Sequence, residues 1–471
     1  MKKVNNINVL ILTLGAFAVS GPAQSASLLE IYQEALQGDP QIHEAEARRL
    51  AALEAKPQAR GVLLPQIQAT GDWSSTSTDG SSFSIINSAT TSFDQESDST
   101  NWGFGLRQTL FRWDQIVNLR RADKTVTKAE AVREAAQQDL IVRVAQRYFD
   151  VLAAEDRLTS IIADRDAIAR QLEQAKQRFD VGLIAITDVQ ESQAAYDQSV
   201  ANEISAKRSL ATAREYLREI TGSYVTELNA PGDDFPLLTP EPNNETSWVD
   251  MSLSQNLILV ASRLDEKLAR DEISYRRNGH YPTIDLVAST GENKSKGDTF
   301  ANPPGFTSTF DDSTTRDQIQ IQVTLPLFAG GATSSRVKEA VYLHRASREQ
   351  LQRVTRETER QARDAYLGVL AEIARVNALA KAVESSETAL QATQAGYEVG
   401  TRTIVEVLNS QFALYAAITN YYQSRYDYIM NALRLKQAAG TLQVQDLERI
   451  DKWLSDRPSP GQVRPTAREG S

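Results

Sequence analysis

The chain has 471 residues, of which 41% are hydrophobic and 24% are charged, so it is long enough to bury a large core. Its formal net charge of −10 argues against nucleic acid as a partner, because phosphate binding needs a basic surface. Cysteine is absent, which excludes a disulfide framework, a zinc finger and a thiol nucleophile.

The N-terminal residues have the pattern of a secretory signal peptide. Lys2 and Lys3 provide positive charge, residues 9–19 are mostly apolar, and small residues follow, so cleavage is predicted after Ala26. An uncleaved membrane anchor is the alternative, but this apolar run is too short to span the ~30 Å hydrocarbon core of a bilayer. We therefore expect residues 1–26 to be a signal peptide and the mature chain to be exported without a transmembrane helix.

Residues 27–222 are expected to form a first structural repeat, which begins with short helices and two strands. Asp39 is a predicted N-cap and Pro40 the first residue of the second helix. After Pro65 apolar residues alternate with polar ones around 66–73 and again around 101–107, which predicts two strands. The segment between them is rich in Ser, Thr and Asp, so we expect a long polar loop there.

A very long helix is predicted from Asp114 to Gly182, because neither proline nor glycine interrupts this segment. At ~1.5 Å per residue it would extend about 100 Å, which is typical of a coiled coil or a helical array. A shorter antiparallel helix is predicted to return over residues 189–220 and to end at Gly222. Together these two segments form a helical hairpin.

After a proline-containing linker, residues 223–246, the same order of elements is expected in a second repeat, residues 247–440. Its strands are predicted around 283–289 and 318–325, with a polar loop at 292–314, and its long helix runs over 333–399. Apolar residues in this helix recur with a mean spacing near 3.5, as in a coiled-coil seam. A return helix over 406–439 ends at Gly440, and the end of the C-terminal extension, residues 441–471, is expected to be disordered.

The same sequence motif occurs at the turn of each of the two helical hairpins. The first is F-D-V-G-L-I-A-I-T-D-V-Q-E from Phe179, and the second is Y-E-V-G-T-R-T-I-V-E-V-L-N from Tyr397. Gly182 and Gly400 stand where a helix must end, because glycine adopts the left-handed conformation that closes it. In the second motif, Thr403 and Glu406 have the spacing of a capping box that starts the next helix.

Four strands are too few to close a membrane barrel, which needs at least about eight. Three chains would supply twelve strands, with Ile, Leu and Trp facing lipid and Gln and Thr facing a lumen. The predicted fold is therefore mixed α and β: a trimeric 12-stranded transmembrane β-barrel with long α-helical coiled coils, which either continue the barrel as a cylinder or form a purely structural coiled coil. A small sheet at the edge of a soluble β-sandwich remains the alternative.

On four motifs the chain resembles the TolC family of trimeric outer-membrane efflux and secretion channels. They are L-L-P-Q-I from Leu63, R-F-D-V-G-L-I-A-I-T-D-V-Q from Arg178, V-G-T-R-T-I-V-E-V-L from Val399 and G-T-L-Q-V-Q-D-L from Gly440. The resemblance covers nearly all of the mature chain. It implies that the 12-stranded barrel is continued by a long periplasmic α-helical coiled-coil tunnel. It also implies that the whole is an exit duct in the outer membrane of a Gram-negative bacterium, serving efflux or type I secretion without a cofactor. It also implies a homotrimer, outer-membrane lipid, a periplasmic adaptor and an inner-membrane pump of the ABC, RND or MFS type as partners.

The resemblance further implies that the two turns form a periplasmic gate. Arg402 and Tyr397 match the family's lock residues on the second hairpin, and Thr187 and Asp188 match their partners on the first. An Arg–carboxylate bond is charge-assisted and directional, as a lock requires. A solvated surface ion pair, which contributes little, is the alternative.

Four further positions are assigned to the same end of the molecule. Glu406 matches a family position that brings carboxylates into the narrowest part of the pore, although it could instead serve only as the helix cap. The second acidic position of that constriction is Asn409 here, so one ring of charge is expected instead of two. Gly182 and Gly400 are expected to form the surface on which the adaptor docks.

An enzyme is not expected. The histidines, His43, His280 and His344, are far apart in the sequence and lack metal-ligand spacing. No phosphate-binding glycine loop or nucleophile elbow is found. Two other classes remain open: a periplasmic coiled-coil adaptor or scaffold without a pore, and a secreted enzyme or adhesin.

Overall fold

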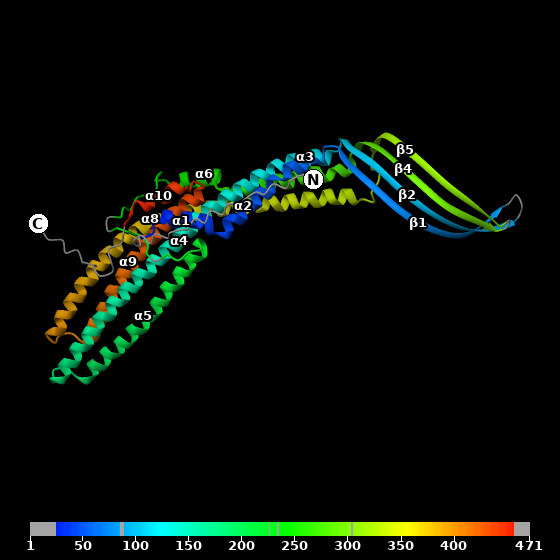
Figure 1. The fold of residues 1–471 in the computed structure, drawn as a ribbon. Helices are drawn as coiled ribbons and strands as arrows, with labels where there is room; N and C mark the ends of the chain where they lie inside the picture. The colour runs from blue at the N-terminus through cyan, green and yellow to red at the C-terminus, as the bar shows by residue number, and fades with distance from the viewer. Residues whose placement is uncertain (1–24, 85–88, 226, 233–234, 303–304, 456–471) are drawn as a thin grey trace, which may run out of the picture.

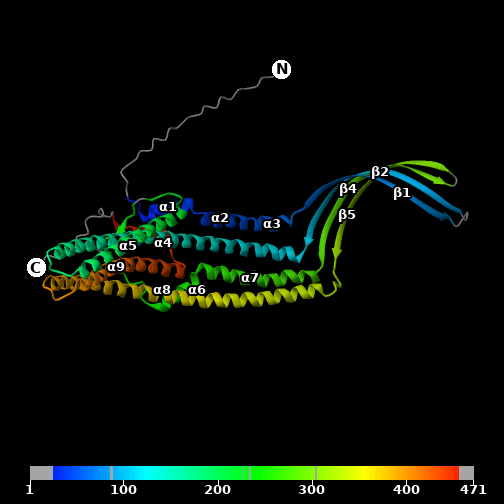
Figure 2. The ribbon, with the colours of Figure 1, turned by 90° about the horizontal axis from the view of Figure 1, so that it is seen from below.

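The computed structural model describes residues 25–455, except 85–88, 226, 233–234 and 303–304. The molecule is a long rod of helices with a sheet at one end and two helical turns at the other (Figures 1 and 2). Nearly all of the predicted signal peptide, and the C-terminal segment 456–471, lie outside the described residues.

Two very long helices, α4 (Trp113–Asp180) and α8 (Ala332–Glu398), connect the sheet to the turns. Two return helices, α5 (Ile186–Thr221) and α9 (Ile404–Ala439), run back beside them. Gly222 and Gly440 end the return helices with φ of 77° and 73°. The predicted helical hairpins are confirmed to within a few residues at each end.

Shorter helices complete the rod. They are α1 (Leu28–Gly38), α2 (Pro40–Leu53), α3 (Ala55–Gly61), α6 (Glu245–Gln255), α7 (Leu257–Arg277), the 3-10 helix η1 (Asn278–His280) and α10 (Val444–Asp451). Asp39 caps α2 as predicted, because its carboxylate accepts from the Gln41 amide at 3.3 Å. In the part of the chain described, no helix combines the length and apolarity needed to cross a membrane.

The helices of the rod lie side by side, and different helices are neighbours at its two ends. Near the turns α5 packs on α4, α4 on α9 and α9 on α8, whereas near the sheet α7 lies between α4 and α8. The α9 and α7 ends meet where the Asn256 amide donates to the Ala438 carbonyl at 3.0 Å. The largest core lies in the middle of the rod, where α1 and α10 pack together and Phe149 stacks on Tyr426. A two-stranded sheet of β3 (Ala230–Pro231) and β6 (Leu454–Ser455) joins this region.

The larger sheet has four antiparallel strands in the order β1-β2-β4-β5. They are β1 (Gln66–Ser84), β2 (Ala89–Phe111), β4 (Thr283–Asn302) and β5 (Phe306–Thr324). The predicted long polar loops are wrong, because these residues extend the strands and pair as far as Ser84 with Ala89 and Ala301 with Phe306. Polarity indicated a loop, but serine and threonine also suit a strand that is solvated on both faces.

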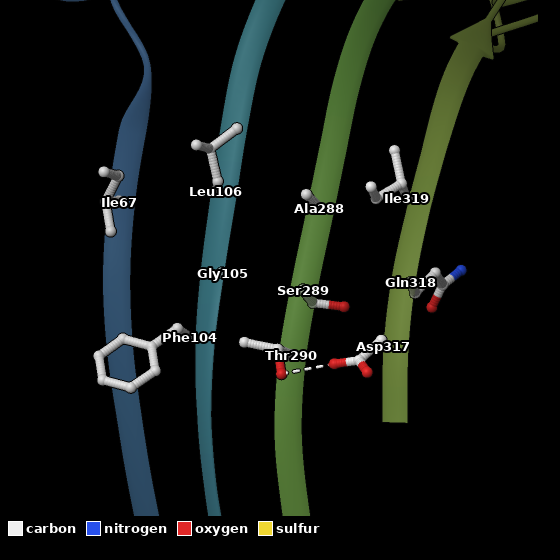
Figure 3. Close-up of a pocket in the computed structure, with 10 residues that line it drawn as sticks. All are labelled: Ile67, Phe104, Gly105, Leu106, Ala288, Ser289, Thr290, Asp317, Gln318 and Ile319. Carbon is white, nitrogen blue, oxygen red and sulfur yellow. Dashed lines mark hydrogen bonds between the residues drawn. The ribbon is translucent and has the colours of Figure 1, made fainter. Parts of the chain in front are cut away.

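The two faces of this sheet differ in polarity. One face carries apolar cross-strand rows near the helices, for example Ile67, Leu106, Ala288 and Ile319. Figure 3 shows this region, which is hollowed by a depression of about 300 Å³. The other face carries rows such as Gln68, Gly105, Ser289 and Gln318. Along each strand, therefore, alternate residues meet different surroundings.

Candidate functional site

The first turn joins α4 to α5 at the end of the rod farthest from the sheet (Figure 1). Gly182 has φ of 76°, its amide donates to the Phe179 carbonyl, and the Leu183 amide donates to the Arg178 carbonyl, both at 2.8 Å. This pair of hydrogen bonds is the Schellman closure of a helix, which requires a left-handed residue at the C′ position. The predicted role of Gly182 in ending the helix is confirmed.

The second turn repeats this geometry between α8 and α9. Gly400 has φ of 78°, its amide donates to the Tyr397 carbonyl at 3.1 Å, and the Thr401 amide donates to the Gly396 carbonyl at 2.9 Å. A Cβ placed on either Gly182 or Gly400 would meet nothing within 4 Å. Both turns therefore leave open space where a partner can approach.

The residues beside the two glycines are apolar and exposed. Val181, Leu183 and Val399 have 71%, 74% and 75% of their surface accessible. Such a patch at the end of a rod is a typical interaction surface, because the free energy falls when a partner covers exposed apolar side chains.

The start of α9 is held by the predicted capping box, which is confirmed. The Thr403 hydroxyl accepts from the Glu406 amide at 3.4 Å, and the Glu406 carboxylate accepts from the Thr403 amide at 2.8 Å. The second carboxylate oxygen of Glu406 pairs with Arg402 at 2.8 Å. The Thr403 amide and the Arg402 guanidinium hold the pKa of Glu406 below its usual range.

The candidate lock residues lie in the two turns but are not bonded to one another within one chain. No hydrogen bond or ion pair joins Asp188 to Arg402 or Tyr397 among the described residues. Instead Arg402 pairs with Glu406, and the Arg178 guanidinium lies 5.2 Å from the centre of the Tyr397 ring. Thr187 and Asp188 occupy the first turn of α5, which has no side-chain cap at Ala185.

The two hairpins are joined by a buried hydrogen bond that sequence reasoning missed. The Gln411 amide on α9 donates to the Asp164 carboxylate on α4 at 2.8 Å and to its carbonyl at 3.1 Å. Gln411 is 2% exposed, and burial raises the pKa of Asp164. The repeat pairs Gln411 with Gln193, but Gln193 bonds Asp197 within its own helix. Sequence pattern alone gives no sign of the contact with Asp164.

Asn409 is the last predicted site residue, and the histidines, which are not predicted to form a site, lie apart from it. Asn409 is exposed one turn after Glu406, on the same side of α9. His344 contacts Glu266 at 2.7 Å and His43 contacts the Gln37 carbonyl at 2.9 Å. Over the described ranges, no group of three or more His, Asp or Glu side chains is arranged to hold a metal ion.

The family follows from a comparison with known proteins. The model of the family described as outer membrane efflux protein matches residues 31–223 and 248–441, which together make up most of the chain. The chain therefore belongs to the outer membrane efflux protein family. It is an outer-membrane protein with a periplasmic extension, and its family is one of efflux channels, not of enzymes.

Within this family the chain is similar to TolC. The outer membrane protein TolC of Vibrio cholerae serotype O1 is 36% identical over 436 residues, which cover 93% of this chain and 95% of that protein. The alkaline protease secretion protein AprF of Pseudomonas aeruginosa is 28% identical over 465 residues, covering 98% and 92%. The solved structure of the outer membrane protein VceC of Vibrio cholerae has the same fold, with a TM-score of 0.71, 19% identity and coverage of 88% and 96%. The predicted membership of the TolC family is confirmed.

Proposed function

We propose that three copies of this chain assemble into one channel with a closed barrel of twelve strands. The observation that carries the proposal is the pair of free sheet edges. β1 and β5 each have 19 residues and no further neighbour in the described chain. Long unpaired edges invite pairing with another chain, and closure removes them. Four strands cannot close alone, whereas twelve lie within the range of known membrane barrels.

The polarity of the sheet supports a barrel in the membrane. Ile319, Ile321 and Val323 on one face of β5 are 81%, 65% and 62% exposed in the single chain. A lipid environment suits such a belt, and the Gln and Thr side chains of the opposite face suit a water-filled lumen. A poreless periplasmic scaffold would leave this apolar belt without a partner.

The function is that of an outer-membrane exit duct. Substrates that leave an inner-membrane transporter pass through the tunnel and the barrel to the outside. The AprF relative supports a role in type I secretion, and the family model supports efflux. The chain supplies no energy in this account, and an inner-membrane pump of the ABC, RND or MFS type drives transport through a periplasmic adaptor. The two similar halves, residues 27–222 and 247–440, each contribute one hairpin and two strands.

The turns form the periplasmic gate in this account. Within one chain Asp188 is not bonded to Arg402, so its carboxylate is available to a donor on the neighbouring hairpin of the assembled trimer. Arg402 and Tyr397 act as donors towards Thr187 and Asp188 and hold the turns together, and rotation of the hairpins opens the gate like an iris.

We expect the protein to be extracted from the outer membrane by detergent and to have the mass of a homotrimer. Native mass measurement of the detergent complex tests this directly. A monomer that leaves the membrane with salt alone would contradict the proposal.

Bulky residues at the turn glycines should block export without affecting assembly. Gly182→Trp and Gly400→Trp place a large side chain in space that is empty in the single chain, so any obstruction arises with a partner. Export falls strongly while trimer yield stays normal, measured as dye accumulation in cells and as purified trimer.

A matched control distinguishes the effect of side-chain bulk on export from the effect of backbone strain at a positive φ. Gly400→Asn puts a small residue that tolerates a positive φ at the same position, and export should be close to normal. Unchanged export with Trp at both glycines would exclude these turns as the docking surface for the adaptor.

A further inference from the structure

The polar face of the sheet carries aromatic side chains near the ends of both strand hairpins. The register places Phe93 on this face of β2, directly opposite Gly80, and Phe310 on the same face of β5, directly opposite Gly297. Most residues nearer the helices on this face are polar or glycine. The two phenylalanines therefore interrupt a surface that otherwise suits water.

Both rings lie against the glycine across from them. A Cβ on Gly80 would lie 2.5 Å from the ring of Phe93. A Cβ on Gly297 would lie 2.1 Å from the Glu96 carbonyl oxygen and 2.9 Å from the ring of Phe310. A side chain at Gly80 would therefore displace the ring of Phe93, whereas at Gly297 it would meet the backbone of β2 as well as the ring of Phe310. The same aromatic–glycine pair thus occurs once in each hairpin, and in both cases the ring covers a strand position that has no side chain of its own.

The pairs lie beyond the apolar belt. The apolar belt, which is the apolar face of the sheet near the helices and includes Ile319, Ile321 and Val323, ends near Trp102. Phe93 lies about 30 Å farther along β2, at ~3.3 Å per residue. Phe306 lies in the same cross-strand row as Phe93, with Ala301 between them, and is 55% exposed. Near its end away from the helices, the polar face therefore carries three phenylalanines: Phe93 and Phe306 in one cross-strand row, and Phe310 four residues from Phe306 along β5.

We propose that Phe93 and Phe310 line the outer end of the pore and form an apolar constriction there. The inference rests on the proposed trimer, in which the polar face of each sheet surrounds the lumen. Twelve strands about 4.8 Å apart, tilted by ~40°, give a backbone cylinder roughly 24 Å across. Six phenylalanine rings from three copies lie along the wall of a cylinder of this width and narrow it.

The constriction favours one chemical class of cargo. Apolar rings that face water slow the passage of hydrated ions and large polar solutes. Aromatic or amphipathic cargo can instead stack transiently on the rings and move past them. The barrel then has a selective outer end in addition to the periplasmic gate at the opposite end of the molecule.

A cysteine reporter placed below the constriction tests this proposal, because the chain has no cysteine of its own. Asn293 is exposed on the polar face of β4, between the phenylalanine pairs and the belt. In intact cells carrying Asn293→Cys, a bulky membrane-impermeant maleimide added outside should react slowly. Adding Phe93→Ala and Phe310→Ala should raise this rate several-fold, since the rings no longer narrow the path.

Matched controls exclude indirect effects. Asp94 and Asp311 neighbour the two phenylalanines but lie on the opposite face, so Asp94→Ala with Asp311→Ala should leave the rate unchanged. Phe93→Tyr with Phe310→Tyr keeps the bulk of the rings and should keep the slow rate. A readout from outside the cell is independent of the periplasmic gate.

The outcomes separate the two proposals. A protein that is trimeric by native mass, yet shows the same reaction rate with and without the phenylalanines, overturns the constriction alone. Failure of the reporter to react in the alanine variant of such a trimer also overturns it, because the polar face would then not line an open lumen. A monomeric protein overturns the proposed function itself.

Discussion

The double variant Arg402→Ser, Tyr397→Phe is expected to conduct several-fold more current than the wild-type channel in planar bilayers. Both substitutions remove hydrogen-bond donors that, in the lock we propose for the trimer, bind Thr187 and Asp188 and hold the turns of neighbouring hairpins together. A charge-assisted hydrogen bond contributes roughly 1.5–3 kcal/mol when sheltered and less when exposed. The Arg402 side chain is 57% exposed in the single chain, so its contribution lies at the lower end, but it is repeated three times around the axis.

Variants on the acceptor side provide the control for this lock. Asp188→Asn removes the charge of the proposed acceptor and should raise conductance as the donor variants do. Glu406→Gln removes both the pairing with Arg402 observed within one chain and the charge of the proposed ring, but it leaves the lock donors in place. It should therefore alter ion selectivity without the several-fold rise in conductance. Wild-type conductance in the double variant would show that these residues do not hold the turns closed.

Glu406→Ala should weaken both the cation selectivity of the channel and its block by trivalent cations from the periplasmic side. In the proposed trimer, three Glu406 carboxylates around a narrow axis would form a strongly negative site, and several carboxylates can share one hard cation. Asn409→Asp adds a second ring of charge one turn away and should strengthen the block. Current–voltage curves with and without the cation measure both effects.

The pH dependence of the block distinguishes a ring from a cap. In the single chain the Thr403 amide and Arg402 lower the pKa of Glu406, so the carboxylate stays charged below the usual range of glutamate. The stability that its cap contributes is then present above the unfolded pKa and is lost as the pH falls through the lowered pKa. Crowding of three carboxylates acts in the opposite direction and raises the pKa.

Block that disappears at a pH above the usual range of glutamate therefore indicates a crowded ring. Block that persists to lower pH indicates that each Glu406 remains paired with Arg402. Arg402→Lys retains a positive charge beside Glu406 and serves as the matched control. If Glu406→Ala lowers stability but leaves selectivity and block unchanged, Glu406 is only a helix cap.

Local sequence signals predicted the helical part of the molecule well. Helix caps and helix-ending glycines act through hydrogen bonds to residues within a few positions, so their spacing in the sequence is sufficient to identify them. Those identified here are Gly182, Gly400, Asp39 and the Thr403–Glu406 capping box. The same reasoning failed for the strand hairpins. There polar residues, which indicate a loop when considered alone, are held in strands by pairing along the whole length of β1, β2, β4 and β5.

The parts of the site that escaped prediction depend on contacts between distant segments. Gln411 meets Asp164 across two hairpins, and Arg178 lies over Tyr397 across the two turns. Likewise Gly80 and Phe93 are recognisable as a pair only once the strand register is known. Periodicity identifies which face of an element is apolar, but not which residue of another element lies opposite.

Interchain cross-linking between β1 and β5 tests the central claim of a closed trimeric barrel most directly. Thr70→Cys on β1 is combined in turn with Gln318→Cys, Gln320→Cys and Gln322→Cys on β5, and the protein is oxidised in the membrane. Within one chain β2 and β4 separate these strands, so a disulfide cannot form inside the chain without disrupting the sheet. If three copies close the barrel, at least one pair gives a covalent trimer on a denaturing gel, while each single variant gives only monomer. Monomer alone with every pair would contradict closure of the barrel by three copies.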